Sequence, residues 1–173
     1  MKLKVVLVFV LLASLFFMGC ENIDPPTQNS VDDPQQQSLS RPWPEAVDEL
    51  GEKFVTAFNE GDLETIMSCW YNSPNTLLVL ENGIVVQGYE NIYAGTEQLI
   101  SATEWRTLTV DEIISRFRVN DEVYTVGKAT WHYKLVGGPE VTFQEVWTDV
   151  AKKISGKWVY IVDHAHDLTP FAP

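Results

Sequence analysis

The sequence predicts an α+β domain in which helices come first and a long antiparallel sheet follows. Apolar residues recur at helical spacing over residues 44–70, whereas β-branched and aromatic residues dominate residues 105–166. Turn-forming pairs divide this second region into four long segments. Because helices and strands are separated along the chain and do not alternate, we expect the helices to cover one face of the sheet.

Three helices are expected. The first begins at Pro44 or Glu45 and ends before Gly61, a residue that commonly terminates helices in the left-handed conformation. Its apolar face consists of Val47, Leu50, Phe54, Ala57 and Phe58. Asp62 then caps a second, short helix. A third helix is expected over residues 90–103, where apolar residues lie seven apart.

The remaining segments predict strands joined by tight turns. A short hairpin over residues 76–87 turns at Asn82-Gly83, which is the strongest hairpin signal in the chain. Four long strands follow, over 105–119, 122–136, 141–154 and 157–166. Their connecting turns are expected at Asn120-Asp121, Gly137-Gly138 and Ser155-Gly156.

Residues 1–19 resemble a bacterial lipoprotein signal peptide. A basic start precedes an apolar run over residues 5–17, which is too short for an ordinary membrane-spanning helix. The run ends in Gly19-Cys20, as in a lipobox; a plain signal peptide with an incidental cysteine is the alternative. Residues 20–41 are polar and proline-containing, which indicates a disordered tether before a folded domain over residues 42–173. The resemblance implies export and anchoring to the cell envelope by lipidated Cys20, at the outer membrane in a Gram-negative cell.

The net charge and the motifs of the sequence limit the classes of partner and cofactor that we expect the protein to bind. The 173 residues include 12 basic and 24 acidic residues, for a formal net charge of −12. This balance argues against nucleic acid and anionic lipid surfaces, so we expect membrane association through the lipid anchor only. The sequence contains no glycine-rich phosphate loop, nucleophile elbow or Cys/His metal motif, and we expect no cofactor.

The last two strands contain the candidate site. A two-residue loop at Ser155-Gly156 would place two histidines and two carboxylates on one face of the sheet. The opposed pairs in this register are Glu145 with His166, Trp147 with His164 and Asp149 with Val162. A carboxylate orients an imidazole and raises its basicity, so His164, His166 and Glu145 are the candidate catalytic groups. Two alternatives remain open. A desolvated Glu145 or Asp149 could itself act as the base, or the histidines could have a purely structural role.

His132 joins this face only in one of two registers. A two-residue loop at Gly137-Gly138 places His132 opposite Phe143, whereas inclusion of Pro139 in the loop moves His132 to the other side. The spacing of His164 and His166 would suit two metal ligands, but the sequence fixes no third ligand, and we predict no metal site.

Three motifs resemble the nuclear-transport-factor-2-like (NTF2-like) superfamily in its SnoaL-like branch. The first is the segment 54–62, which ends in the turn Glu60-Gly61-Asp62, and the second is the run Gly88-Tyr-Glu-Asn-Ile92. The third is the closing pattern of Thr148, Gly156-Lys-Trp158 and His164. His166 stands where relatives often carry serine. The resemblance implies a cone-shaped, curved antiparallel or mixed sheet covered by three N-terminal helices, as in cystatin-like folds. It also implies a pocket between helices and sheet, and homodimers that form through the outer sheet face.

Aromatic residues are expected to line this pocket. Trp70 and Tyr71 end the short helix, where relatives open their pocket, and Trp105 and Trp147 lie on predicted strands. His132 and Asp149 are the expected polar ligand contacts. An aromatic cleft with few polar groups suits a small apolar or ring-containing molecule. Because SnoaL-like relatives include enzymes, binding domains and association domains, catalysis and a non-catalytic binding or homodimerisation role both remain open.

Overall fold

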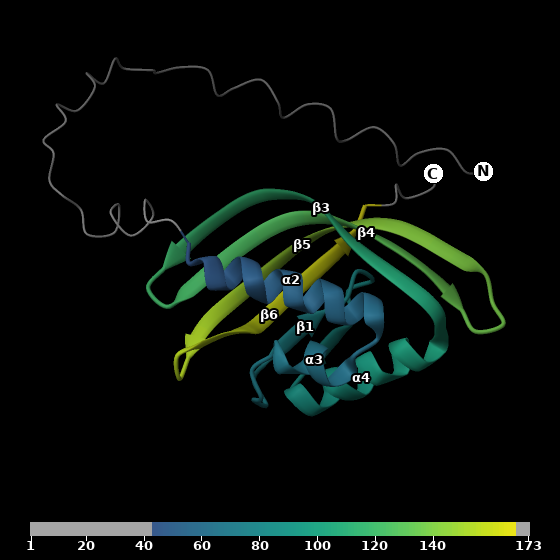
Figure 1. The fold of residues 1–173 in the computed structure, drawn as a ribbon, viewed down its shortest axis with the longest axis horizontal. Helices are drawn as coiled ribbons and strands as arrows, with labels where there is room; N and C mark the ends of the chain where they lie inside the picture. The colour runs from purple at the N-terminus through teal and green to yellow at the C-terminus, as the bar shows by residue number, and fades with distance from the viewer. Residues whose placement is uncertain (1–42, 169–173) are drawn as a thin grey trace, which may run out of the picture. The chain divides into compact units, whose positions relative to one another are not determined.

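The computed structural model describes residues 43–168, and its elements follow the predicted order (Figure 1). The helices are α2 (Glu45–Glu60), α3 (Leu63–Ser68) and α4 (Tyr89–Ala102). The strands are β1 (Leu77–Val79), β2 (Val85–Gln87), β3 (Thr103–Val119), β4 (Glu122–Leu135), β5 (Glu140–Ile154) and β6 (Lys157–Asp167). The predicted signal peptide, Cys20 and the tether lie outside the described residues.

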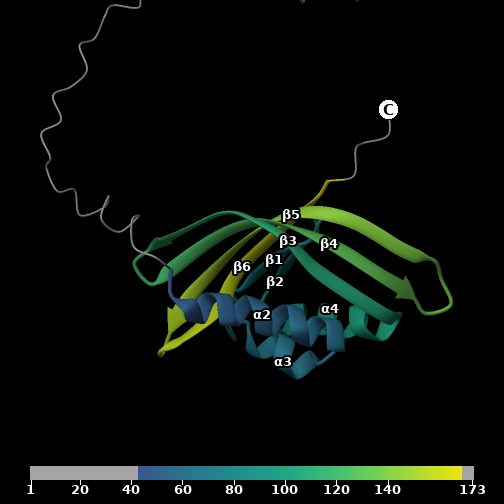
Figure 2. The same ribbon diagram turned by 45° about the horizontal axis from the view of Figure 1, so that its top comes forward.

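The strands in this part of the chain form one sheet in the order β2-β1-β6-β5-β4-β3. Neighbours are antiparallel except β1 and β6, which run parallel. Figure 2 shows the curved sheet arching over the three helices. The predicted α+β class, with a curved mixed sheet covered by helices, is therefore confirmed.

The predicted helix ends are also confirmed. Gly61 adopts φ 74°, and its N–H donates to the Phe58 carbonyl at 3.1 Å, which closes α2. The Asp62 carboxylate then accepts from the Thr65 N–H at 3.0 Å and caps α3. Local hydrogen bonds thus set the corner between the two helices.

Helix α2 is held on the concave side of the sheet by aromatic and amide contacts. The Phe58 and Trp131 rings meet edge to face at 4.9 Å between centroids. Asn59 donates to the Leu108 carbonyl at 3.1 Å and accepts from the Leu108 N–H at 2.6 Å. These contacts fix α2 against β3 and β4. Side chains from the middle of the sheet face the space between α2 and the sheet.

The hairpin between β5 and β6 follows the predicted register only near its turn. Ser155-Gly156 is a two-residue loop, and the pairs agree as far as Ala151 opposite Tyr160. A β-bulge then inserts Ile161 as an extra residue, so that every later residue of β6 changes sides. The predicted pairing beyond Tyr160 is therefore wrong.

The register between β4 and β5 also differs from the one that a two-residue loop at Gly137-Gly138 would give. The Leu135 N–H donates to the Pro139 carbonyl at 3.2 Å, which places Val136 in the loop. Phe143 consequently lies opposite Trp131, and His132 lies opposite Thr142. His132 is thus on the convex side of the sheet, the side given by the alternative register, although Val136 and not Pro139 causes the shift.

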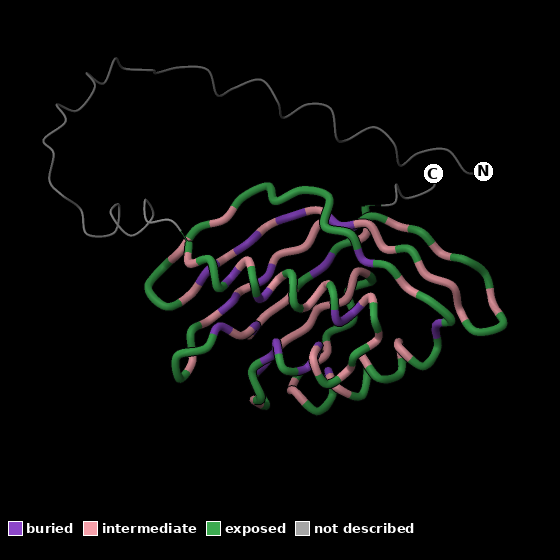
Figure 3. The backbone as a smooth tube through the Cα atoms, in the orientation of Figure 1, coloured by how far each residue is buried: buried purple, intermediate pink, exposed green. Residues whose placement is uncertain are grey.

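Buried residues concentrate where the helices meet the sheet (Figure 3). The most completely buried side chains include Ile66, Met67, Cys69, Ile92 and Val123. The Cys69 thiol is free, and burial raises its pKa, which agrees with an inert core position. Over residues 43–168, no helix has the length and apolar character that crossing a membrane requires.

Candidate functional site

A cavity of about 690 Å³ lies between α2 and the concave face of the sheet. Its wall is mainly apolar and rich in aromatic rings, which include Phe54, Phe58, Trp70, Trp131, Trp147 and Tyr160. Gly127 makes room for one of these rings: a Cβ at this position would come within 2.6 Å of Trp147. A cavity of this size and lining suits a small organic molecule.

A row of polar residues crosses the cavity wall at one level of the sheet. Arg116 of β3 lies opposite Thr125 of β4, Thr125 lies opposite Asp149 of β5, and Asp149 lies opposite Asp163 of β6. All four residues line the cavity, and we call them the polar row. The registers of three strand pairs therefore bring one cation, one hydroxyl and two carboxyls together.

Asp149 and Asp163 are directly opposed carboxyls in an apolar setting. Such cross-strand neighbours have Cβ atoms about 5 Å apart. Burial raises the pKa of Asp149 to about 7, against the lowering effects of the Thr125 hydroxyl and Arg116. Burial, together with Asp149 and Glu145, raises the pKa of Asp163 well above its usual range. At neutral pH the pair therefore retains protons that exposed aspartates would release.

Glu145 forms a second acidic position in the same cavity. It lies four residues from Asp149 on β5, about 13 Å along the strand, and is 5% exposed. Burial raises its pKa to about 7, and the charges of Glu81 and Asp167 add to this rise. The nearby Trp131 indole opposes the shift. Glu145 is thus partly protonated near neutral pH, as a group that exchanges protons must be.

The Arg116 end of the polar row is closed by α2. The Arg116 guanidinium forms an ion pair with Asp48, and its Nε donates to the Thr125 hydroxyl at 3.2 Å. Trp43, just before α2, covers the guanidinium at 5.0 Å from its ring centroid and donates its indole N–H to Asp48 at 3.1 Å. Arg116 is therefore neutralised by Asp48 and not by the two buried aspartates.

Known structures with this arrangement of helices and sheet were found by comparison, whereas no family model and no curated protein matches the sequence. An NTF2-like superfamily protein from Salmonella enterica superposes with a TM-score of 0.67 at 15% identity, covering 74% of this chain and 92% of that one. A candidate dehydratase of the NTF2-like family from Streptomyces avermitilis has a TM-score of 0.64 at 18% identity, covering 72% and 96%. The chain has the NTF2-like fold.

Another structural neighbour carries a different functional name. A Xanthomonas campestris protein, described as a candidate association domain of calcium/calmodulin-dependent protein kinase II, has a TM-score of 0.61 at 20% identity. The alignment covers 73% of this chain and 87% of that one. At these identities the likeness establishes the fold alone, and the function must be argued from the site.

The NTF2-like domain brings four of the predicted site residues to the cavity. Glu145 and Asp149 are buried in its wall, Trp147 lies between them on β5, and Trp70 packs beside Tyr160. Three predicted ligand contacts lie elsewhere. Tyr71 is exposed, while Trp105 and His132 contact each other on the convex side at 4.6 Å between ring centroids.

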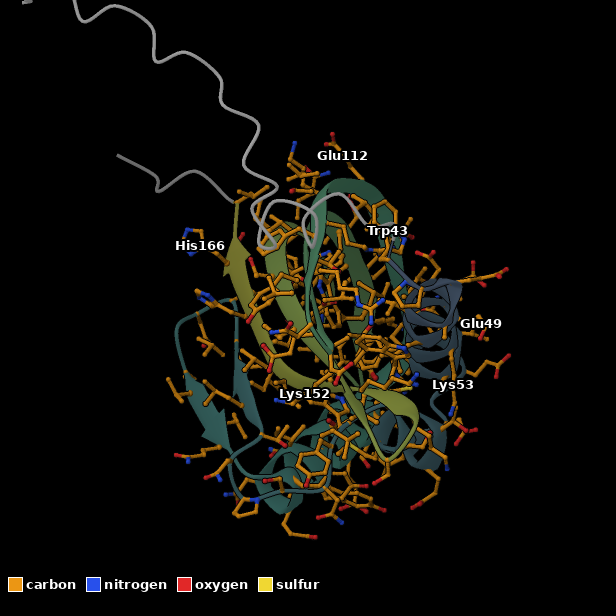
Figure 4. The ribbon with its side chains drawn as sticks, turned by 90° about the vertical axis from the view of Figure 1, so that its left-hand side faces the viewer. Trp43, Glu49, Lys53, Glu112, Lys152 and His166 are labelled. Atoms are coloured by element: carbon orange, nitrogen blue, oxygen red, sulfur yellow. The ribbon has the colours of Figure 1, made fainter. Side chains whose placement is uncertain are left out.

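The predicted association of His164 and His166 with Glu145 is wrong in this structure. Because of the bulge at Ile161, the two histidines lie opposite Thr148 and Val146 on the convex side, and both are exposed. Figure 4 shows His166 at the end of β6, pointing away from α2. Ala165 lies opposite Trp147 and Asp167 lies opposite Glu145, the two positions that were predicted for His164 and His166.

Asp163 and Arg116 were missed by the sequence reasoning. A weak signal for Asp163 is the apolar pair Ile161-Val162, which breaks the alternation of β6 and is compatible with a bulge. Arg116 follows three register shifts in β3, and its partner Asp48 lies 68 residues away. Over residues 43–168, no group of three or more His, Cys, Asp or Glu side chains is arranged to hold a metal ion.

Proposed function

We propose that this NTF2-like domain binds one small, largely apolar molecule in its cavity and performs cofactor-free acid/base chemistry on it. The observation that supports this most directly is the presence of Glu145, Asp149 and Asp163 in a single aromatic cavity. Carboxyls whose pKa is raised toward neutrality are stronger bases when ionised, and they supply protons when protonated. The likeness to a candidate dehydratase is in keeping with this chemistry.

The roles divide along β5. Glu145 takes a proton from carbon or oxygen of the bound molecule, because burial raises its pKa to about 7 and so makes its ionised form a stronger base. A protonated carboxyl of the Asp149–Asp163 pair donates to the oxygen on which negative charge develops. Both steps use side chains of this chain alone and require neither metal nor cofactor.

Proton abstraction can be tested without knowledge of the natural substrate. Ring ketones such as β-tetralone exchange their α-hydrogens for deuterium slowly in D₂O, and NMR follows this exchange. We expect the protein to accelerate the exchange, Glu145→Gln to abolish the acceleration, and the exposed control Glu97→Gln to leave it unchanged. Binding of the ketone without acceleration would refute the catalytic proposal and leave a binding domain.

A homodimer is a second proposal, supported by the convex face. Phe117, Tyr124, Val150 and Val162 form an apolar row across β3 to β6 on this face, and the Phe117 and Tyr124 rings stack at 5.0 Å. We propose that two copies meet there. Sedimentation of the wild type and of Phe117→Glu tests this: a dimer converted to a monomer supports the contact, and a monomeric wild type rejects it.

Export and lipid anchoring remain proposals that rest on the sequence of residues 1–20. We propose that Cys20 is lipidated and holds the domain at the cell envelope. Mass spectrometry of the mature N-terminus is the direct test, with Cys20→Ala as the control. A mature chain that begins elsewhere, or that carries no lipid, would reject the proposal.

A further inference from the structure

The charges around the cavity are unbalanced. Of the described residues that line it, six are acidic, namely Asp48, Glu52, Glu81, Glu145, Asp149 and Asp163, and Arg116 alone is basic. Asp48 already forms an ion pair with Arg116. Arg116 is near enough to lower the pKa of Asp149, but within the described residues no cation forms an ion pair with Asp149 or Asp163.

Asp149 also carries an unused hydrogen-bonding position. Its side chain is more than nine-tenths buried, and within the described residues Oδ1 has no hydrogen-bond partner. A buried acceptor without a partner is costly, by about 1–3 kcal/mol, unless a bound group donates to it. Asp149 itself lines the cavity, on the concave face of β5 opposite Asp163.

These observations specify the chemistry of an occupant. A ligand cation placed against the pair would donate a hydrogen bond to Asp149 Oδ1 and offset the repulsion between the two carboxylates. The aromatic walls would cover its apolar part, and tryptophan faces also attract organic cations. The formal net charge of −12 would favour the approach of a cation from solution.

We propose that the cavity selects an apolar ring compound bearing a positively charged amine, and that the Asp149–Asp163 pair holds the ammonium group. This inference rests on the proposed function, since it names the ligand class of the same cavity. For a ligand of this class the aspartate pair holds the ammonium group in place of donating a proton, and Glu145, about 13 Å along β5, lies beside the apolar part of the ligand as the acid/base group.

Ammonium binding should release protons. Burial raises the pKa of Asp149 to about 7, so near neutral pH the pair is partly protonated before the amine enters. The cation stabilises the ionised carboxylates and expels that proton. Other titratable groups of the surrounding elements line the same cavity: Asp48 and Glu52 of α2, Glu81 after β1, Arg116 of β3, Tyr133 of β4, Glu145 of β5 and Tyr160 of β6.

Comparing amines with alcohols of the same skeleton separates the effect of the ligand's charge on its affinity from the effect of its shape. Phenethylamine, naphthylethylamine and biphenylethylamine are titrated into the full-length protein by calorimetry, each beside the alcohol of the same skeleton. We expect the best-fitting amine to bind at least about tenfold more tightly than its alcohol near pH 7. Measured in two buffers with different ionisation enthalpies, its binding should release protons.

Two double variants show which carboxylates cause the preference for amines over alcohols. Asp149→Asn/Asp163→Asn should bring the affinity of the amine down to that of the alcohol. Glu49→Gln/Glu97→Gln, which removes two exposed carboxylates of α2 and α4, should keep the full preference (Figure 4 shows Glu49 directed away from the sheet). The amide NMR spectrum reports whether each variant is folded, and Asp163→Asn alone serves if the double variant is not.

The outcomes distinguish the two proposals. Equal or tighter binding of the alcohols by the wild type would overturn the amine assignment while supporting a small-molecule cavity. A preference for amines that survives in the Asp149→Asn/Asp163→Asn variant would also overturn it, because another carboxylate would then hold the cation. Failure of all six compounds to bind would overturn both the amine assignment and the proposed function.

Discussion

Replacing Asp149 with asparagine tests the electrostatic state of the cavity, because asparagine keeps the shape of the side chain and cannot ionise. Burial raises the pKa of Asp149 from 3.8 to about 7 in the folded protein. Between these two values the folded state binds more protons than the unfolded state, so the free energy of unfolding falls as the pH rises. The loss is complete above the folded-state pKa, where Asp149 is buried in its ionised form.

The size of the effect follows from the shift. A rise in the pKa of Asp149 from 3.8 to about 7 lowers the free energy of unfolding at high pH by about 4 kcal/mol. Asp149→Asn should therefore be more stable than the wild type by up to about 4 kcal/mol near pH 8 and nearly equal to it near pH 4. Asp163 adds to this gain above neutral pH, because without the opposed charge of Asp149 its own pKa falls toward the ordinary value and its ionisation costs the folded state less.

Urea unfolding followed by tryptophan fluorescence, repeated from about pH 4 to about pH 8, measures this dependence. Glu97→Gln, an exposed substitution on α4, serves as the control and should follow the wild-type curve. A stability difference between Asp149→Asn and the wild type that stays constant with pH would refute the reasoning. So would a variant that becomes less stable relative to the wild type as the pH rises.

Three further substitutions test other parts of the structure. Gly127→Ala should lower the free energy of unfolding by about 1–3 kcal/mol in urea titrations, because its Cβ meets the Trp147 ring at 2.6 Å and a backbone carbonyl at 2.7 Å; an unchanged midpoint would contradict this packing. Asn59→Ala should cost about 1–3 kcal/mol, since it leaves the buried Leu108 N–H and carbonyl without their partner, and hydrogen exchange at Leu108 should accelerate. His164→Ala/His166→Ala should leave the affinity for cavity ligands unchanged in calorimetry, because both side chains lie on the convex face; a lowered affinity would place them in the site.

The elements of the fold were predictable because their signals are local. Gly61 and Asp62 mark the corner between α2 and α3 through hydrogen bonds within a few residues. Asn120-Asp121 and Ser155-Gly156 adopt the two-residue turns that their composition favours. The order of helices and strands followed from these signals and from apolar spacing, and the resemblance to NTF2-like motifs suggested how the elements pack.

The site was only partly predictable because its membership depends on register. Glu145, Trp147 and Asp149 alternate on one strand, so they share a face whatever their neighbours do. Which residues of β4 and β6 join them depends on single-residue shifts at Val136 and Ile161, for which the sequence offers weak signals. Contacts such as Arg116 with Asp48 join distant segments and leave no local pattern.

The bulge at Ile161 creates both the space and the charge of the cavity. Without it, His164 would lie opposite Trp147 and fill the volume that Ala165 leaves open, and Val162 would lie opposite Asp149. With it, a carboxyl faces a carboxyl in an apolar cavity, an arrangement that raises both pKa values and weakens the folded state at neutral pH. An apolar side chain at either position would stabilise the sheet more. Folding alone gives no reason to oppose Asp149 and Asp163, whereas a site that must hold a cation or exchange a proton does.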